Sequence, residues 1–280
     1  MSPLMTFTVV TTVVGLALVG IVAALPALLR RRGVTMRRTR FGVTLVFDSQ
    51  DADGTPVRLL NVNGAFQSVS YVPEELRFEL ACEYHRVIAG LVEGLCRQRA
   101  PRRVMVMGGG GYSLPKYLAA HVRAASTDVV EIDPAITRIA REDFFLDECL
   151  ERTGACRAGR LRLHNDDAWG FLRAAEEPYD VIVNDAFSGS RPLGPMETVE
   201  GARVVREHLC PDGVYLANVR CAFEGRRSRP LREVEEAFGH EFAHVWFVPE
   251  WPDEPEKPGN NVFVATDAEL PMPQGAHVVR

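Results

Sequence analysis

The stretch Val104-Met105-Val106-Met107-Gly108-Gly109-Gly110-Gly111 decides the fold, because four apolar residues of strand length run directly into four glycines. Glycine lets the backbone turn tightly and approach a ligand without a Cβ atom in the way. We expect segment 113–122 to form the helix that follows. Strand, glycine turn and helix in this order are typical of the ligand-binding edge of an open α/β sheet.

Three more apolar runs of strand length end at carboxylates, namely Glu131, Asp167 and Asp185. Parallel strands of an open α/β sheet end at the same ligand-binding edge, so we expect the three acids to gather there. Glu131 can accept hydrogen bonds from both ribose hydroxyls of a nucleoside. We expect Asp167 to meet an adenine amino group and Asp185 to face the reacting group.

Two other interpretations suit parts of this pattern. A plain strand-to-helix turn explains the glycines, and an NAD-binding Rossmann domain explains the glycines together with Glu131. Neither interpretation needs an acid at Asp167 or at Asp185. A cofactor of the S-adenosyl type fits the whole set better.

These motifs resemble those of the spermidine synthases and spermidine synthase-like proteins, the polyamine aminopropyltransferase branch of the class I S-adenosylmethionine-dependent methyltransferase superfamily. The resemblance runs from Phe41 to Thr266, and segment 58–68 looks like the family's N-terminal β-hairpin motif, with Asn63 in place of its aspartate. It implies an α/β, Rossmann-like class I methyltransferase fold with an N-terminal β-hairpin region. It also implies Asp185 as the catalytic base and a set of cofactor-binding residues: Gly108, Gly109, Gly110, Glu131, Asp133, Asp167, Ala168 and Gln67.

The function implied by the resemblance is transfer from an S-adenosyl-derived sulfonium, either decarboxylated S-adenosylmethionine or S-adenosylmethionine. An aminopropyl group would pass to a small-molecule amine, and the family suggests a homodimer. Family members that make polyamines carry three residues that hold a diamine, and Gly111, Phe78 and Ser188 replace them here. The loop after Asp185 is also longer and brings Arg191 to the place of the second acid. Since fewer carboxylates make a doubly charged amine costlier to desolvate, we do not expect putrescine specificity.

Two other functions stay open at this point. One is an S-adenosylmethionine-dependent methyltransferase acting on an unknown small molecule, because Gly111 removes the acid that would repel the cofactor's own carboxylate. The other is a non-catalytic adenosyl-binding or scaffold protein that has the fold without turnover.

The N-terminal run from Thr6 to Leu29 is apolar apart from Thr and Gly, and is about long enough to cross a bilayer at 1.5 Å per residue. Positive charge follows this run and does not precede it, which disfavours a cleaved signal peptide. The charges are Arg30, Arg31, Arg32, Arg37, Arg38 and Arg40. By the positive-inside rule we expect a transmembrane helix over residues 6–29, a single-pass anchor in the cell membrane with the catalytic domain in the cytoplasm.

Two other functions, nucleic-acid binding and zinc proteolysis, are disfavoured by the sequence. The formal net charge of −5 disfavours nucleic acid as the main partner. His240-Glu241-Phe242-Ala243-His244 matches the zinc-protease signature, whose two histidines must share one face of a continuous helix. We expect Gly239 to end a helix over 231–238 and a strand to run over 245–248, so we predict no metal site.

The domain organisation expected from the sequence has four parts. They are a transmembrane anchor with its basic flank over 1–33, a β-hairpin and helix region over 34–97, a Rossmann-like nucleoside-binding catalytic domain over 98–268, and a C-terminal tail over 269–280.

Overall fold

The computed structural model describes residues 24–98, 102–188, 191–192, 197–273 and 275–279. The chain divides into two units, Met1–Ser68 and Val69–Arg280.

The smaller unit is built on an antiparallel sheet of strand order β1-β2-β3-β4, whose last strand continues into the larger unit. β2 and β3 form a hairpin, since they pair antiparallel. Asp51 fixes the turn between them by accepting hydrogen bonds from the backbone N–H groups of Asp53 and Thr55. The strands are β1 (Val34–Thr39), β2 (Gly42–Gln50), β3 (Pro56–Val62) and β4 (Ala65–Tyr71).

The transmembrane helix predicted over residues 6–29 is corrected by the structure. Among the residues described, none of the helices is both long and apolar enough to cross a bilayer. Residues 6–23 of the predicted span lie outside the described residues. The predicted anchor and the cell-membrane localisation are therefore withdrawn.

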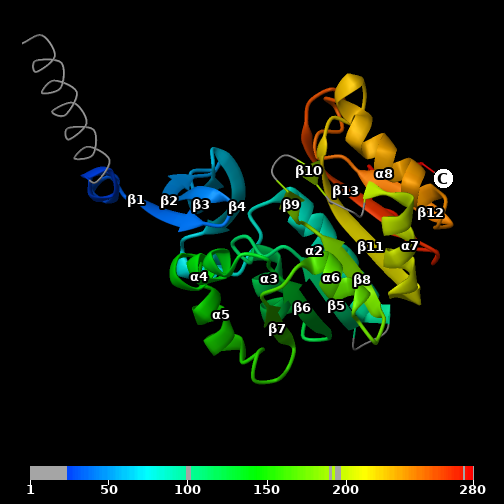
Figure 1. The fold of residues 1–280 in the computed structure, drawn as a ribbon, viewed down its shortest axis with the longest axis horizontal. Helices are drawn as coiled ribbons and strands as arrows, with labels where there is room; N and C mark the ends of the chain where they lie inside the picture. The colour runs from blue at the N-terminus through cyan, green and yellow to red at the C-terminus, as the bar shows by residue number, and fades with distance from the viewer. Residues whose placement is uncertain (1–23, 99–101, 189–190, 193–196, 274, 280) are drawn as a thin grey trace, which may run out of the picture. The chain divides into compact units, whose positions relative to one another are not determined.

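The larger unit contains a sheet of strand order β14-β12-β13-β11-β8-β5-β6-β7 (Figure 1). From β11 to β7 neighbouring strands pair in parallel. The chain passes from β5 to β6 and β7 on one side and then returns to β8 on the other side, so the order reverses at β5. The α/β, Rossmann-like prediction is thereby confirmed. These strands are β5 (Arg102–Met107), β6 (Ala125–Val130), β7 (Leu161–His164), β8 (Tyr179–Asn184) and β11 (Leu209–Cys221).

Antiparallel strands close the other end of this sheet. β13 (Gly259–Thr266) pairs antiparallel with both β11 and β12 (His244–Val248), and β12 confirms the strand expected over 245–248. β14 (His277–Val278) pairs with β12. A separate short ladder joins β9 (Phe187–Ser188) to β10 (Arg191–Pro192).

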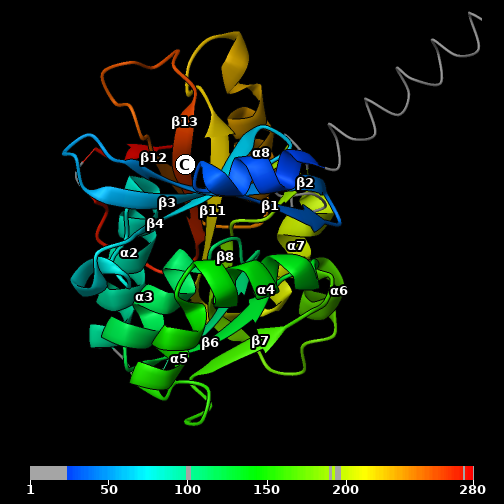
Figure 2. The same ribbon diagram turned by 90° about the vertical axis from the view of Figure 1, so that its left-hand side faces the viewer.

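Helices cover both faces of the larger sheet (Figure 2). Apolar residues of α6, α7 and α8, among them Leu172, Val205 and Phe238, pack with inward residues of the strands in one buried cluster. α3 lies on the opposite face against β6. The helices are α2 (Glu83–Gln98), α3 (Ser113–His121), α4 (Pro134–Asp143), α5 (Leu146–Thr153), α6 (Ala168–Arg173), α7 (Val199–Glu207) and α8 (Arg229–Gly239).

Between β4 and α2, residues 74–76 form a single 3-10 turn, and α2 starts at Glu83. Arginine side chains bind the backbone carbonyls in this stretch. Arg77 Nε donates to Val72 O and Arg86 Nε donates to Leu80 O. These carbonyls are thus satisfied outside a helical ladder.

The two histidines of the zinc-protease signature lie on different elements. α8 ends at Gly239, His240 is its C-cap, and His244 begins β12. The helix end predicted at Gly239 is confirmed, and the continuous helix that the signature requires does not form over these described residues.

Candidate functional site

The carboxyl ends of four neighbouring strands meet at one edge of the sheet. Met107 of β5 pairs with Val130 of β6 and with Asn184 of β8, and Val130 pairs with His164 of β7. The residues that follow these strands, including Gly108, Glu131 and Asp185, are therefore brought together. Because the strand order reverses at β5, this edge is the place where open α/β sheets bind ligands.

Glycine is required where β5 and β8 end. Gly108 has φ +88°, and a Cβ atom there would lie 2.8 Å from the carbonyl oxygen of Asp185. The Asp185 N–H in turn donates to Met107 O over 3.0 Å. A Cβ atom at Gly109 would lie 2.5 Å from the ring of Tyr112. The glycine turn is thus packed closely against the backbone that carries Asp185.

The Glu131 carboxylate lies against the glycine turn. It accepts hydrogen bonds from the backbone N–H of Gly109 at 2.8 Å and from that of Asp133 at 2.9 Å. The residue is 6% exposed. Burial raises the pKa of the Glu131 carboxyl, although the surrounding N–H donors oppose the shift. The carboxylate and the turn form one polar cradle.

Three other predicted cofactor-binding residues lie at helix starts on the same edge. Asp133 caps α4 by accepting from the N–H of Ala135, and Asp167 caps α6 by accepting from the N–H of Gly170. Asp133 is buried and Asp167 is exposed. Ala168 is the first residue of α6. Helix capping partly explains why an acid stands at each of these two positions, and a role in cofactor binding stays a prediction.

Gln67, the remaining predicted cofactor-binding residue, is on β4 in the smaller unit. Its cofactor-binding role also stays a prediction.

Asp185 is held by three side chains, and these four residues are called here the Asp185 cluster. His85 Nε2 lies 2.9 Å from Oδ2, and Tyr84 donates its hydroxyl to the same oxygen over 3.1 Å. Asn218 Nδ2 donates to Oδ1 over 3.0 Å. Tyr84 and His85 begin α2, and Asn218 is on β11. Three elements therefore converge on one carboxylate.

The electrostatics of the Asp185 cluster favour an ion pair. Burial of the His85 ring opposes its charged form, but the hydrogen bond and charge of Asp185 outweigh it and raise the pKa of His85 to about 9. Burial, followed by the charge of Asp185, raises the pKa of Tyr84 well above its usual value. At neutral pH His85 is thus an imidazolium and Tyr84 a neutral hydrogen-bond donor.

Sequence reasoning missed Tyr84, His85 and Asn218. The ring of Phe78, which stands at the place of the family's tyrosine, lies 5.2 Å from the Arg152 guanidinium, and Tyr84 supplies a hydroxyl to Asp185. One signal was available at Asn218, a polar residue inside the otherwise apolar run of β11.

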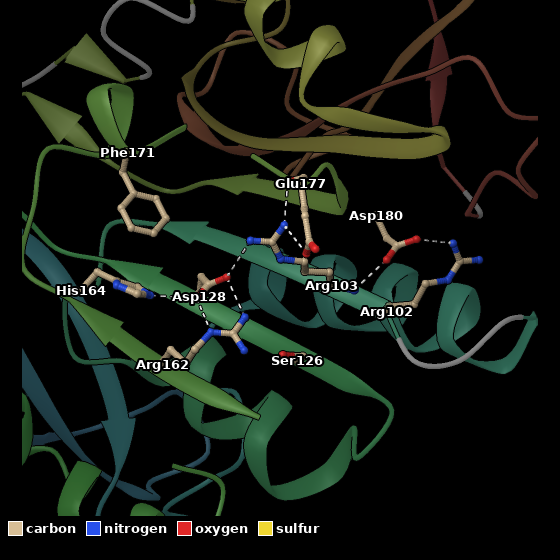
Figure 3. A pocket seen from close by; sticks show the side chains of 9 residues that line it. All are labelled: Arg102, Arg103, Ser126, Asp128, Arg162, His164, Phe171, Glu177 and Asp180. Carbon is tan, nitrogen blue, oxygen red and sulfur yellow. Dashed lines mark hydrogen bonds and ion pairs between the residues drawn. The ribbon is translucent and has the colours of Figure 1, made fainter. Parts of the chain in front are cut away.

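A second group of charged residues surrounds a cavity of about 550 Å³ in the larger unit (Figure 3). Its lining comes mostly from the first residues of β5, β6 and β8 and from β7, away from the edge that carries Asp185. Asp128 is at the centre and its side chain is 3% exposed. Arg162 binds both of its oxygens, at 2.6 and 2.8 Å, and His164 Nε2 lies 2.8 Å from Oδ1.

The charges around this cavity satisfy one another. Burial alone would raise the pKa of Asp128, but the hydrogen bonds from Arg162 and His164 hold it below its ordinary value. Arg103 lies over the Tyr179 ring and donates to the carbonyl of Glu177. Because Asp128, Arg162, His164 and Arg103 already have partners in the protein, this network joins neighbouring strands and leaves little binding capacity for a ligand.

Comparison with known proteins adds family information to this geometry. Residues 81–250 match the family model of the spermine/spermidine synthase domain. The mouse eEF1A lysine and N-terminal methyltransferase is 31% identical over 175 residues, which cover 57% of this chain and 24% of that protein. The polyamine aminopropyltransferase of Oceanobacillus iheyensis is 30% identical over 149 residues, 52% of this chain and 28% of that protein. The chain therefore spans about a quarter of the length of these relatives.

Among solved structures, a probable spermidine synthase from Corynebacterium glutamicum is similar with a TM-score of 0.66 at 23% identity. The similarity covers 84% of this chain and 80% of that one. At this identity the likeness supports the fold.

The His85–Asp185 ion pair predicts a pH dependence of stability. Since the folded pKa of about 9 exceeds the unfolded value of 6.5, the stabilisation is complete below about pH 6.5 and is lost as pH rises through 9. The shift corresponds to about 3 kcal/mol at most. Urea unfolding of the wild type and of His85→Gln at pH 6, 8 and 10 should show a stability difference that shrinks with pH. A difference that stays constant would contradict the ion pair.

The Asp128 network predicts a purely structural effect. Asp128→Asn leaves Arg162 without its charged partner and should lower the free energy of unfolding by about 2 to 3 kcal/mol. Glu177→Gln, whose side chain is 81% exposed, is the control and should change it by about 0.5 kcal/mol or less. Urea unfolding measures both. If folded Asp128→Asn lost adenosyl-ligand binding at unchanged stability, the cavity would instead be part of a ligand site.

Proposed function

Since this chain belongs to the spermine/spermidine synthase family, we propose that it transfers an aminopropyl group from decarboxylated S-adenosylmethionine to an amine, with Asp185 as the general base. The observation that carries the proposal is the Asp185 cluster, in which three donors hold a carboxylate at the switch-point edge of the sheet. The glycine turn and Glu131 lie at the same edge.

The residues at this edge suit an adenosyl group. A carboxylate offers about four acceptor positions, so Glu131 has capacity for ribose hydroxyls beyond its bonds to Gly109 and Asp133. Asp167 uses Oδ2 to cap α6, and its other oxygen would accept from the adenine amino group. Gly108 to Gly110 would let the chain that bears the sulfur lie close to the backbone.

The bound sulfonium would supply a carbon that an amine attacks, with the C–S electron pair leaving on sulfur as a neutral thioether. Asp185 has two donors on Oδ2 and one on Oδ1, which leaves an acceptor position on Oδ1 for the amine. As the nitrogen becomes positively charged, Asp185 would stabilise that charge and then accept the proton. His85, Tyr84 and Asn218 would fix the orientation of the Asp185 carboxylate.

Methyl transfer is the second candidate function, favoured by Gly111. No carboxylate is present at this position of the turn, so the amino acid part of intact S-adenosylmethionine would meet less repulsion. The similarity to the mouse methyltransferase supports the same candidate.

Calorimetry with decarboxylated S-adenosylmethionine, S-adenosylmethionine and methylthioadenosine tests the two functions against each other. The leading proposal expects the decarboxylated cofactor and methylthioadenosine to bind more tightly than S-adenosylmethionine. Tight binding of S-adenosylmethionine with weak binding of the decarboxylated form would favour methyl transfer. Failure of all three ligands to bind would contradict both functions.

Glu131→Gln should weaken adenosyl-ligand binding, because it replaces an ionised acceptor of similar shape by a neutral one. Charge-assisted hydrogen bonds contribute roughly 1.5 to 3 kcal/mol each, so affinity for methylthioadenosine should fall by about tenfold or more. Calorimetry measures the change, and Glu177→Gln is again the matched control. Unchanged affinity in a folded Glu131→Gln protein would mean that this acid does not bind the ribose.

Asp185→Asn should abolish the base while keeping the shape of the side chain. Turnover should fall by at least ~10²-fold, with the affinity for methylthioadenosine nearly unchanged. Single-turnover kinetics with decarboxylated S-adenosylmethionine separate the chemical step from binding. Full activity of the variant would remove Asp185 from the chemistry.

A further inference from the structure

Two neutral amide side chains, those of Asn218 and Asn260, lie beyond Asp185 on the sheet and are called here the Asn218–Asn260 wall. Asn218 donates to Asp185 and also lies 3.4 Å from Asn260 Oδ1 on the neighbouring strand β13. Amide groups therefore occupy the positions next to the base on this side. The charge of Asp185 itself is already balanced by the His85 imidazolium, which leaves little net attraction for a second positive charge on the acceptor.

Arg220 is at the end of this wall. It is directly opposite Asn260 in the antiparallel pairing of β11 with β13, and cross-strand partners point to the same face. It also lies two residues beyond Asn218 on the same strand, so the two side chains share a face about 7 Å apart along the strand. Arg220 is exposed, and its side chain has no hydrogen-bond or ion-pair partner among the residues that the structure describes.

Glu250 is the competing charge in this region. Its Oε2 accepts from the backbone N–H of Asn260 at 2.6 Å and from Asn260 Nδ2 at 3.1 Å. Its own N–H donates to Asn261 Oδ1. Glu250 therefore clamps its loop to β13, whereas the guanidinium of Arg220 is available to a ligand.

We propose that the acceptor is a primary amine whose other end is an anion, of the ω-amino carboxylate class. Its amine would meet Asp185 Oδ1, its short methylene chain would cross the Asn218–Asn260 wall, and its carboxylate would bind the guanidinium of Arg220. Arginine suits this role because its fork of N–H donors matches both oxygens of a carboxylate. The inference rests on the proposed transfer to an amine and names the class of acceptor.

Three acceptors of equal chain length test the inference: 4-aminobutyrate, butylamine and putrescine, which end in an anion, a neutral methyl group and a second cation. With decarboxylated S-adenosylmethionine, kcat/KM should be at least tenfold higher for 4-aminobutyrate than for either other amine. Arg220→Gln should reduce the ratio of kcat/KM for 4-aminobutyrate to that for butylamine by tenfold or more. Arg229→Gln, an exposed arginine on α8 paired with Glu233, is the matched control and should leave this ratio unchanged.

Preference for putrescine, lost in Glu250→Gln, would overturn the inference and leave aminopropyl transfer in place. Equal use of the three amines, unaffected by Arg220→Gln, would overturn it as well.

Calorimetry of the same three amines with the protein saturated by methylthioadenosine judges the acceptor class without turnover. The protein should bind 4-aminobutyrate at least tenfold more tightly than butylamine or putrescine, and Arg220→Gln should remove this preference. If 4-aminobutyrate bound no more tightly than putrescine, the inference would be overturned. Tight 4-aminobutyrate binding with no transfer to any amine would instead contradict the proposed function.

Discussion

The close approach of the backbone at Gly108 to the backbone at Asp185 is the constraint on which the candidate site depends. The carbonyl oxygen of Asp185 lies where any side chain at residue 108 would begin, and the N–H of Asp185 binds the last carbonyl of β5. This contact joins the ends of β5 and β8 at the point where the strand order reverses. It places Asp185, the proposed base, next to the turn proposed to receive the cofactor.

The Asp128 and Asp185 carboxylates of the larger unit have contrasting surroundings. Asp128 receives Arg162 on both oxygens, together with His164, and its bonding capacity is filled by the protein itself. Asp185 has three partners and no arginine among them, and Oδ1 has room for one more donor. A saturated acid holds strands in place, whereas an acid with remaining capacity can act on a ligand. The number and kind of donors distinguish the two acids, as does burial, since the side chain of Asp128 is 3% exposed and that of Asp185 is 17% exposed.

The sequence predicted the parts of the fold that local pattern controls. Apolar runs that end in glycine or an acid predicted β5, β6 and β8, and Gly239 predicted the end of α8. The capping of α4 by Asp133 also has a local signal, because Pro134 follows at the first helical position. The predicted membrane span failed because apolar length and flanking arginines describe only the segment itself.

The partners of Asp185 could not be predicted in the same way. Tyr84 and His85 are separated from it by about a hundred positions, and their place beside it depends on how α2 packs on the sheet. The residues proposed to contact the acceptor could not be predicted for the same reason. Arg220 and Asn260 become neighbours only through the antiparallel return of β13, and nothing near either residue in the sequence specifies that pairing.

The dispersal of the Asp185 cluster along the chain has a consequence for biosynthesis. Its contacts close loops of 101, 100 and 33 residues, and the wall that extends it needs β13, which is synthesised after nearly all other strands. Contacts between distant residues form slowly because loop closure must precede them. On the ribosome, the nascent chain would therefore carry Asp185 and Asn218 for some time before their surroundings are complete. Competence for binding an acceptor would be acquired only after β13 has been synthesised and has paired with β11.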